Sequence, residues 1–328
     1  MASVLISGAS IAGPALAYWL HRYGFTVTVV ERAPGVRTGG YPIDIRGSAI
    51  DIVDRMGILP ALREATIDTQ RLTTLRGDGR VTAGIEVSQL LGASASRDVE
   101  LPRGELSDLL YGLTRDKVEY VFGDSLRRLT PTATGVEAVF EHGEPRTVDL
   151  VVGCDGLHSI TRHLVFGPER DYHRYLGYCF AGYTVPNPEG LAHEAVLQNE
   201  PGLMAAVYAV RRLPVMNALL AFTDPQPSRG WTENDLRGRV RNRFAGMGGR
   251  VPWLLEHLET ADDLYYDTVS QIRMPAWTSG RVALVGDAAY APSFFSGQGT
   301  SLALAGAYVL AGELHRAGGD PGRAFPAC

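Results

Sequence analysis

A glycine-containing turn joins a short apolar strand to a helix near the start of the chain, and it limits the folds that the chain can adopt. Ser3 to Ser7 reads as the strand, and the turn runs from Gly8 to Gly13. Residues 14–23 carry apolar side chains on one helical face, and Gly24 is typical of a helix end. Residues 25–30 form a second β-branched strand, which should lie parallel to the first because such crossovers are right-handed. The opening therefore predicts a Rossmann-like α/β unit.

This turn has the chemistry of a dinucleotide site. Gly8 allows the tight bend, and Gly13 lets the helix pack closely on the strand. Ser10 stands where the usual fingerprint has its middle glycine, and it is small enough for a pyrophosphate to approach the N–H groups at the helix start. Glu31 can accept hydrogen bonds from ribose hydroxyls and would repel a 2′-phosphate, although Arg32 follows it. The alternative is a purely structural strand, turn and helix.

A second unit of strand, turn and helix occurs in the middle of the chain. The strand Val148 to Val152 leads into Gly153-Cys154-Asp155-Gly156, and a helix follows. Asp155 can cap that helix, and Ser159 and Arg162 fall on its first turns. Two interpretations are open from these residues alone: a helix cap with an exposed Arg162, or a second part of the nucleotide site.

A third unit lies near the end of the chain. The apolar strand Val282 to Val285 stops at Gly286-Asp287, a loop with Pro292 follows, and a helix of small residues begins near Thr300. Asp287 can accept a hydrogen bond from a sugar-alcohol hydroxyl. The glycines of Gly297-Gln298-Gly299 would let backbone N–H groups point at a ring carbonyl or a phosphate. The alternative is again a strand, a turn and a helix cap.

The stretch between these units has a different pattern. Residues 71–97 are typical of a β-hairpin, with its turn at Gly77 to Arg80. In residues 175–225, β-branched and aromatic residues alternate between turns, which favours a sheet. Residues 232–260 become helical, and residues 264–274 return to strand. Nucleotide-type segments at both ends thus bracket another sheet, which predicts a cofactor domain that is discontinuous in sequence.

Composition narrows the remaining classes of protein. The net charge is −5 and the basic residues are scattered rather than striped, which argues against a nucleic-acid partner. The three cysteines, Cys154, Cys179 and Cys328, show no CxxC spacing, so we expect no disulfide framework, no metal site and a reducing cytoplasm. The N-terminus lacks the features of a signal peptide, and no apolar run is long enough for a transmembrane helix.

Taken in order, the three motifs resemble the FAD-dependent aromatic hydroxylase family. Its members are single-component flavoprotein monooxygenases, typified by para-hydroxybenzoate hydroxylase and the tetracycline-inactivating monooxygenases. The resemblance spans residues 3–316 and is weakest over about 165–270. It implies FAD as cofactor, NADPH or NADH as electron donor, and dioxygen as co-substrate. It also implies hydroxylation of an aromatic or polyketide-like small molecule through a flavin C4a-hydroperoxide.

The resemblance implies cofactor-binding roles for individual residues. Glu31 resembles the ribose-binding acid, Arg46 an arginine near the pyrophosphate and flavin, and Arg103 an arginine that contacts the cofactor. No side chain is assigned as an acid or base, because the chemistry centres on the flavin. The implied cofactor-binding residues are Gly8, Ser10, Ile11, Ala12, Gly13, Glu31, Arg32, Arg46, Arg103, Asp155, Arg162, Asp287, Pro292, Gly297, Gly299, Thr300 and Ser301.

The later motifs also take family roles. Asp155 with Arg162 resembles the family's second fingerprint, linked to both FAD and the nicotinamide donor. Asp287 resembles the acid that binds ribitol, and Gly297 to Ser301 the loop under the pyrimidine end of the flavin. Tyr290 departs from the family, in which many members have a histidine at this position.

The expected fold class is α/β (α+β overall), with two domains. A Rossmann-like FAD-binding domain would comprise residues 1–70, 98–165 and 275–328, and an inserted mixed β-sheet substrate domain residues 71–97 and 166–274. Side chains that could line a substrate pocket, or else belong to an ordinary core, are Tyr178, Tyr183, Met204, Tyr208, Phe294 and Phe295.

Alternative functions share this fold. One is a flavin-dependent reductase or dehydrogenase of an apolar small molecule. Another is an FAD-binding remnant without productive turnover, because family members usually continue past the helix at about 302–314 and we expect this chain to be short at its C-terminus. A flavin halogenase is disfavoured, because the sequence has no Trp-x-Trp-x-Ile-Pro element. The protein is expected to be a monomer or homodimer.

Overall fold

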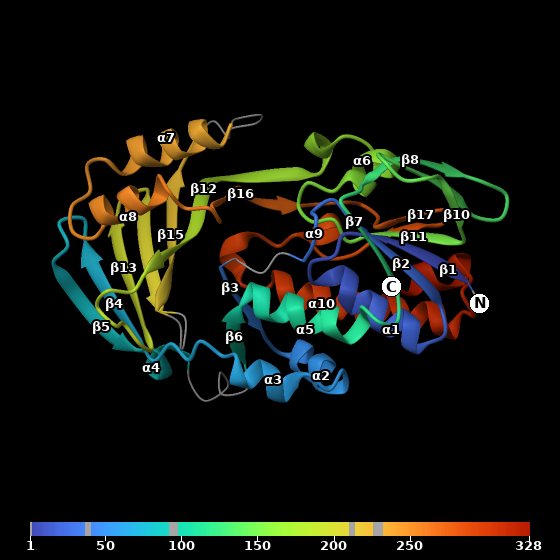
Figure 1. Ribbon diagram of the computed structural model, residues 1–328, viewed down its shortest axis with the longest axis horizontal. Helices are drawn as coiled ribbons and strands as arrows, with labels where there is room; N and C mark the ends of the chain where they lie inside the picture. Colours follow the sequence, from blue (N-terminus) through green and yellow to red (C-terminus); the bar gives the residue numbers. More distant parts are fainter. Residues whose placement is uncertain (1, 37–40, 92–97, 210–213, 226–231) are drawn as a thin grey trace.

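Two large β-sheets form the two halves of the protein. The computed structural model describes residues 2–36, 41–91, 98–209, 214–225 and 232–328. A six-stranded sheet lies in the half that carries both chain termini, and a seven-stranded sheet forms the other half (Figure 1). The mixed α/β architecture predicted from the sequence is confirmed.

The six-stranded sheet has the order β17-β18-β11-β1-β2-β7 and is parallel except for the edge strand β17. Its central strands are continuous apolar runs, as expected for parallel strands covered on both faces. The predicted parallel pairing of the first two strands is confirmed. The strands are β1 (Ser3–Ser7), β2 (Thr26–Glu31), β7 (Glu119–Phe122), β11 (Leu150–Gly153), β17 (Thr278–Ser279) and β18 (Val282–Leu284).

Three helices pack beside this sheet: α1 (Ala12–Arg22), α5 (Arg103–Thr114) and α10 (Gly299–Arg316) (Figure 1). Small buried residues such as Ala15 and Ala307 belong to the core between α1 and α10. Helix α1 lies directly on the turn that precedes it, because a Cβ added at Gly13 would fall 1.9 Å from the Gly8 carbonyl oxygen. Only glycine fits that contact.

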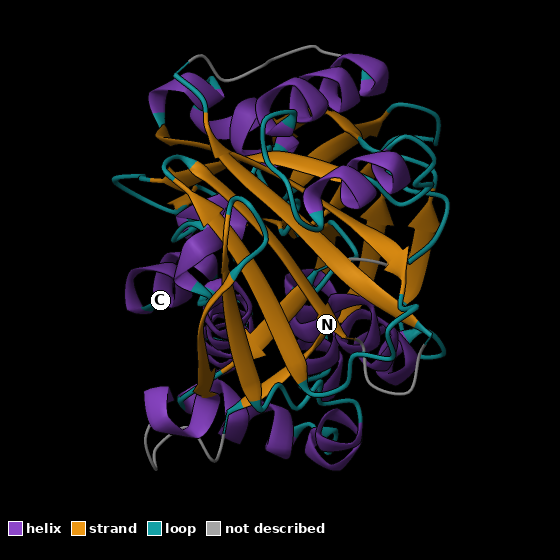
Figure 2. Ribbon diagram, turned by 90° about the vertical axis from the view of Figure 1, so that its left-hand side faces the viewer, coloured by secondary structure: helices purple, strands orange, loops and turns teal. Residues whose placement is uncertain are grey.

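The seven-stranded sheet has the order β16-β12-β15-β14-β13-β4-β5, and only the pair β13–β4 is parallel. Its long strands run side by side across the molecule (Figure 2). Helices α7 (Glu233–Phe244) and α8 (Val251–Leu258) cover its outer face and share one apolar core with it. Its strands are β4 (Arg71–Arg76), β5 (Val81–Glu86), β12 (His173–Pro186), β13 (Glu194–Glu200), β14 (Leu203–Ala209), β15 (Val215–Thr223) and β16 (Tyr265–Ile272).

Smaller elements complete the described chain, and none of its helices is long and apolar enough to cross a membrane. The paired strands are β3 (Pro42–Ile45) with β6 (Val99–Pro102), and β8 (Leu126–Pro131), β9 (Val136–Phe140) and β10 (Arg146–Val148). The helices are α2 (Ser48–Arg55), α3 (Leu59–Glu64), α4 (Val87–Leu91), α6 (Ile160–Phe166), α9 (Asp287–Tyr290) and α11 (Pro321–Ala324), with 3-10 turns η2 (Glu169–Asp171), η3 (Phe294–Ser296) and η4 (Phe325–Ala327).

The two sheets draw their strands from different parts of the sequence. All strands of the six-stranded sheet come from residues 1–70, 98–165 and 275–328, and all strands of the seven-stranded sheet from residues 71–97 and 166–274. Residues 92–97 of the predicted hairpin segment lie outside the described residues. The division into a cofactor domain and a substrate domain follows this pattern, and its boundaries stay a prediction.

Candidate functional site

The glycine turn lies between a carboxylate and an arginine. The buried Glu31 carboxylate accepts hydrogen bonds from the N–H groups of Ala9, at 2.8 Å, and Ala33, at 2.9 Å. The Arg103 guanidinium donates to the Ser10 hydroxyl at 2.6 Å. No side chain caps the start of α1. A helix start without a cap leaves N–H groups and partial positive charge for an anion.

The third predicted motif meets this turn at Gly286. A Cβ added there would lie 3.2 Å from the Ala12 Cβ and 3.4 Å from the Ala303 Cβ, so the first turns of α1 and α10 both touch this glycine. Gly286 has a φ of 70°, in the left-handed region that favours glycine. The first and third motifs are therefore brought together at the carboxyl edge of one parallel sheet, where β11 separates β18 from β1 and where α/β proteins bind ligands.

Asp287 stands directly after this junction. Its side chain is exposed, yet protein atoms surround the carboxyl group closely enough for desolvation to raise its pKa. The nearby Asp267 carboxylate raises this pKa further, and Arg103 lowers it. The Asp287 carboxyl group is thus open to solvent on one side and close to protein atoms on the other. This environment suits an acid that binds a ligand.

The start of α10 is joined to β3 and the residue that follows it. The backbone N–H of Arg46 donates to the Ser301 hydroxyl at 2.9 Å, and the Arg46 side chain pairs with Asp44 at 2.9 Å. Gly297 is left-handed, and a Cβ added to it would lie 2.8 Å from an Asp44 carboxylate oxygen. The start of α10 has no side-chain cap, and Thr300 is buried there. Two other predicted residues lie apart from this contact. The Arg32 side chain is exposed. The Pro292 carbonyl accepts a hydrogen bond from the Gln271 side chain.

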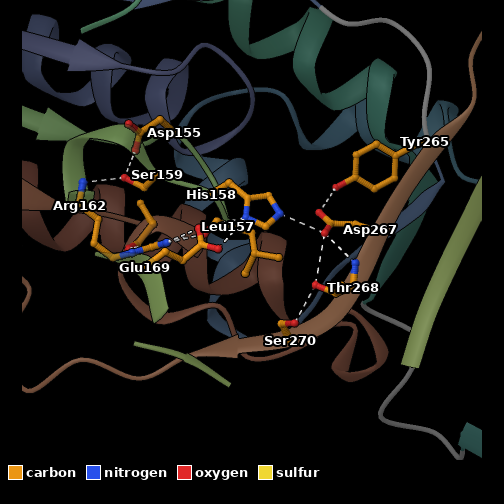
Figure 3. A network of polar contacts seen from close by, with 11 residues as sticks. Asp155, Leu157, His158, Ser159, Arg162, Glu169, Tyr265, Asp267, Thr268 and Ser270 are labelled. Carbon is orange, nitrogen blue, oxygen red and sulfur yellow. Dashed lines mark hydrogen bonds and ion pairs between the residues drawn. The ribbon is translucent and has the colours of Figure 1, made fainter. Parts of the chain in front are cut away.

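The second motif is held by hydrogen bonds within the protein. The Asp155 carboxylate accepts from the Ser159 hydroxyl (Figure 3). It also accepts from the backbone N–H of Thr161 at 2.9 Å and from the Thr161 hydroxyl at 2.8 Å. It also accepts from Ser7 on β1 at 3.3 Å. Ser159 caps α6 through the N–H of Arg162. Asp155 thus fixes this turn to both β1 and α6.

Arg162 is fully buried, so the interpretation of an exposed arginine after a helix cap is wrong. Its guanidinium donates to the carbonyl of Ala288 at 3.0 Å, to the carbonyl of Leu157 at 2.7 Å, and to Glu169 at 3.1 Å (Figure 3). Ala288 adjoins Asp287, so Arg162 links the second motif to the third. A side chain without exposed surface positions its neighbours rather than contacting a ligand.

A histidine between two acids connects the halves of the protein. The His158 ring contacts Glu169 through Nδ1 at 3.0 Å and Asp267 on β16 through Nε2 at 3.2 Å (Figure 3). Asp267 also accepts from the Tyr265 hydroxyl at 2.9 Å. Hydrogen bonds to Asp267 and Glu169 raise the pKa of His158 to about 9, against the opposing effect of burial.

Groups of three or more His, Cys, Asp or Glu that could hold a metal ion are absent from the described residues.

We predict that His158→Gln weakens the fold in a pH-dependent way. Because the folded-state pKa of His158 lies above its ordinary value of 6.5, its contribution is full below about pH 6.5 and is lost as the pH rises through about 9. The side chain is half-exposed, so we expect a difference of only about 1 kcal/mol at pH 6. Chemical denaturation of both proteins at pH 6 and pH 10 measures it. A difference that is equal at both pH values contradicts the prediction.

An aromatic cluster occupies the inner face of the seven-stranded sheet, toward the cofactor half. Phe294 from η3 stacks on Phe180 of β12, with ring centroids 3.9 Å apart. Tyr41 and Tyr265 surround this pair. Among the predicted pocket residues, Phe294 and Met204 belong to this cluster, and Tyr178 with Phe295 forms an exposed edge-to-face pair at 5.8 Å. Tyr208 is buried on β14.

Tyr183 lies elsewhere and does not fit the predicted pocket. Its side chain belongs to the core under α7 and α8, where its hydroxyl donates to the Leu254 carbonyl at 2.8 Å. Successive residues of a strand point to opposite faces, and Phe180 points inward while Tyr183 points outward. We therefore leave Tyr183 out of the substrate face.

The backbone before Phe294 is strained. Ser293 has φ 114° and ψ 143°, a region that side chains other than glycine rarely adopt. We predict that Ser293→Gly raises the free energy of unfolding by about 1 kcal/mol, because the strain relieved exceeds the added freedom of the unfolded chain. Ser293→Ala keeps the Cβ and should bring no gain. Thermal unfolding of both variants tests this, and equal effects of the two substitutions would contradict it.

Several residues of the site escaped the sequence analysis. Phe180 and Tyr265 give no signal beyond their place in alternating strands. His158 belongs to no pattern that predicts a site, yet its ring contacts two acids that lie far apart in the sequence. Asp267 has no motif around it. Only contacts between the two sheets distinguish these side chains from ordinary ones.

Known proteins similar to this chain have a flavin-binding architecture. A family model described as FAD binding domain matches residues 1–319. An uncharacterized protein of Mycobacterium tuberculosis is 44% identical over 322 residues, covering 98% of this chain and 87% of the relative. A flavin-dependent monooxygenase from an unknown prokaryotic organism is 37% identical over 316 residues, covering 96% and 81%. The crystal structure of tetracycline destructase Tet(51) superposes with a TM-score of 0.90 at 34% identity, covering 100% of this chain and 85% of that chain.

Proposed function

The chain belongs to the FAD binding domain family and is an FAD-dependent monooxygenase, and from this premise we propose that it uses NADPH or NADH and dioxygen to hydroxylate an aromatic or polyketide-like small molecule. The observation that carries the proposal is the junction at Gly286, where the uncapped starts of α1 and α10 meet beside Asp287. Two helix starts supply N–H groups for anionic parts of a ligand.

The residues present fit FAD. At the adenosine end, Glu31 lies beside the glycine turn, and close packing at Gly13 keeps the turn free of side-chain bulk. FAD also needs an acceptor for the hydroxyl groups of its ribityl chain. The exposed Asp287 can supply it, because it follows the carboxyl end of β18. Arg46 and Arg103 bring positive charge toward the same region, which suits a pyrophosphate.

We assign the remaining roles as part of this proposal. Glu31 would accept from the adenosine ribose, Ser10 and Arg46 would lie at the pyrophosphate, and Asp287 at the ribityl chain. The segment Gly297 to Ser301 would lie at the pyrimidine end of the ring. Bound FAD would supply hydride acceptance and oxygen activation. We assign Asp155 and Arg162 as positioning residues, because the Asp155 carboxylate and the two terminal nitrogens of Arg162 bond within the protein.

The chain's own residues shape the environment of the reaction. The partial positive charge at the start of α10 stabilises negative charge near it. The aromatic cluster of Tyr41, Phe180, Tyr265 and Phe294 keeps water from the inner face of the sheet. The same rings offer flat apolar surface to an aromatic substrate.

The nature of the substrate is inferred from this surface and from the relatives. Tet(51) and Tet(55) are tetracycline destructases, and they share 34% and 36% identity with this chain. We therefore expect a planar or fused-ring molecule that bears oxygen substituents, and tetracycline itself is a sensible first compound to test.

Oxygen transfer is the deciding experiment. Purified protein should be yellow, tetracycline or another fused-ring phenol should accelerate NADPH oxidation, and mass analysis should find one atom from labelled dioxygen in the product. Turnover without dioxygen would favour a reductase or dehydrogenase. NADPH oxidation that yields only hydrogen peroxide with every phenol would favour an FAD-binding remnant. Failure to retain FAD would overturn the proposal.

A further inference from the structure

An apolar cluster lies on the inner face of the seven-stranded sheet at its strands β14, β15 and β12. Cross-strand pairing arranges its side chains in rows that run from β14 across β15 to β12. Residues paired directly across strands point to the same face. Two neighbouring rows on the inner face are Met204–Ala221–Phe180 and Ala206–Leu219–Gly182.

The next row is polar. Tyr208 on β14 pairs directly with Asn217 on β15, and these residues are only 9% and 8% exposed. The Tyr208 hydroxyl is buried and has no hydrogen-bond partner within the described part of the chain, so it does not bond to the Asn217 amide. An unpaired buried hydroxyl destabilises the structure, and a ligand that pairs with it would recover this free energy.

The row beside this pair has space for at least one further carbon atom, at Gly182. Gly182 is buried, yet a Cβ added to it would meet only the Ala218 carbonyl oxygen, at 3.8 Å. Ala206, in the same row, is also small. Gly182 and Ala206 are therefore the small members of the row between the polar pair and Phe180, and Leu219 stands between them on β15.

The charges around the pair favour an uncharged partner. Burial raises the pKa of the Tyr208 hydroxyl well above its ordinary value, and Glu100 and Tyr41 add to this, so the hydroxyl stays protonated and can donate. The three rows contain no lysine or arginine. Because none of these rows supplies a cation, a carboxylate placed here would have no partner for its charge among them. A hydroxyl or carbonyl oxygen would accept from Tyr208 and pair with the amide of Asn217.

We propose that Tyr208 and Asn217 form a polar subsite that binds an uncharged hydroxyl or carbonyl group of an aromatic substrate. The inference rests on the proposed function. By fixing one oxygen substituent, the pair orients the substrate ring over the small and aromatic residues of the neighbouring rows. The two residues set specificity and take no part in proton transfer.

The test compares two ligands that differ in one group. Calorimetric titration of flavin-loaded protein with 2-naphthol and with 2-methylnaphthalene should show tighter binding of the naphthol by about tenfold. Tyr208→Phe and Asn217→Leu should each reduce this preference below about threefold. Tyr183→Phe is the matched control, because it removes a hydroxyl from the opposite face of the same sheet and should leave the preference unchanged.

The subsite is overturned if the wild-type protein binds the two ligands equally or binds neither. It is also overturned if the preference for 2-naphthol survives in both subsite variants. The FAD content of each sample and the fate of labelled dioxygen test the proposed function separately. A wild-type protein that retains FAD and transfers oxygen but lacks the preference contradicts the subsite alone. Loss of FAD or of oxygen transfer in the wild type contradicts the proposed function.

Discussion

Replacing Gly13 with alanine is expected to raise the dissociation constant for FAD by at least about 100-fold and to destabilise the fold by about 3 kcal/mol. The added Cβ would lie 1.9 Å from the Gly8 carbonyl oxygen and 3.3 Å from the Ile6 Cγ2. Backbone cannot give way as a flexible side chain does, so α1 must move away from β1. The N–H groups at the start of α1 would then leave the positions that a pyrophosphate needs.

The control is a second helical glycine replaced by the same residue. A Cβ added at Gly112 in α5 meets nothing within 4 Å. Gly112→Ala should therefore stabilise the protein by about 0.5–1 kcal/mol through helix propensity and leave FAD affinity unchanged. Fluorescence titration with FAD and denaturant unfolding measure both effects. If the Gly13 variant binds FAD like the wild type, the close contact does not control the site.

The glycine units could be predicted because their signals are local. In each of the three, an apolar strand, a glycine turn and a helix follow one another within about one supersecondary unit of chain. The strands they belong to are neighbours in one parallel sheet, in the order β18, β11, β1 and β2. Parallel strands align their carboxyl ends, so motifs read separately in the sequence meet at one edge.

The substrate face was harder to predict because it depends on which side of a strand each residue takes. Tyr178 and Tyr183 are an odd number of positions apart on β12, so a regular strand cannot present both to one face. Strict alternation would have excluded one of them. Met204 and Tyr208 are an even number apart on β14 and do share the inner face.

Contacts between the two halves had no sequence signal at all. His158 and Asp267 are 109 positions apart, and no local pattern links a turn in one sheet to a strand in the other. Within the cofactor half, the bond between Arg162 and the Ala288 carbonyl likewise has no local signal, because it spans 126 positions. The family resemblance named Arg162 but not its burial, and this burial supports our proposal that Arg162 positions the cofactor site.

Replacing Arg162 with leucine is the second large effect we expect, with a loss of about 3 kcal/mol or more in the free energy of unfolding. The substitution would leave the carbonyls of Leu157 and Ala288 without their donor in a buried place, and would remove one of the partners of Glu169. Since Ala288 adjoins Asp287, FAD affinity should fall by at least about tenfold in whatever fraction remains folded.

A neighbouring arginine and a conservative change make this prediction decisive. Arg170 in η2 is 78% exposed and pairs only loosely with Asp171, at 3.8 Å, so Arg170→Leu should change stability by less than about 0.5 kcal/mol. Arg162→Lys keeps the charge but loses the planar fork that reaches two carbonyls and a carboxylate, and it should fall between the wild type and the leucine variant. Denaturant unfolding followed by FAD titration of the lysine variant separates the two effects. A lysine variant with wild-type stability and weakened FAD binding would mean that Arg162 acts on the cofactor rather than through the support of Ala288.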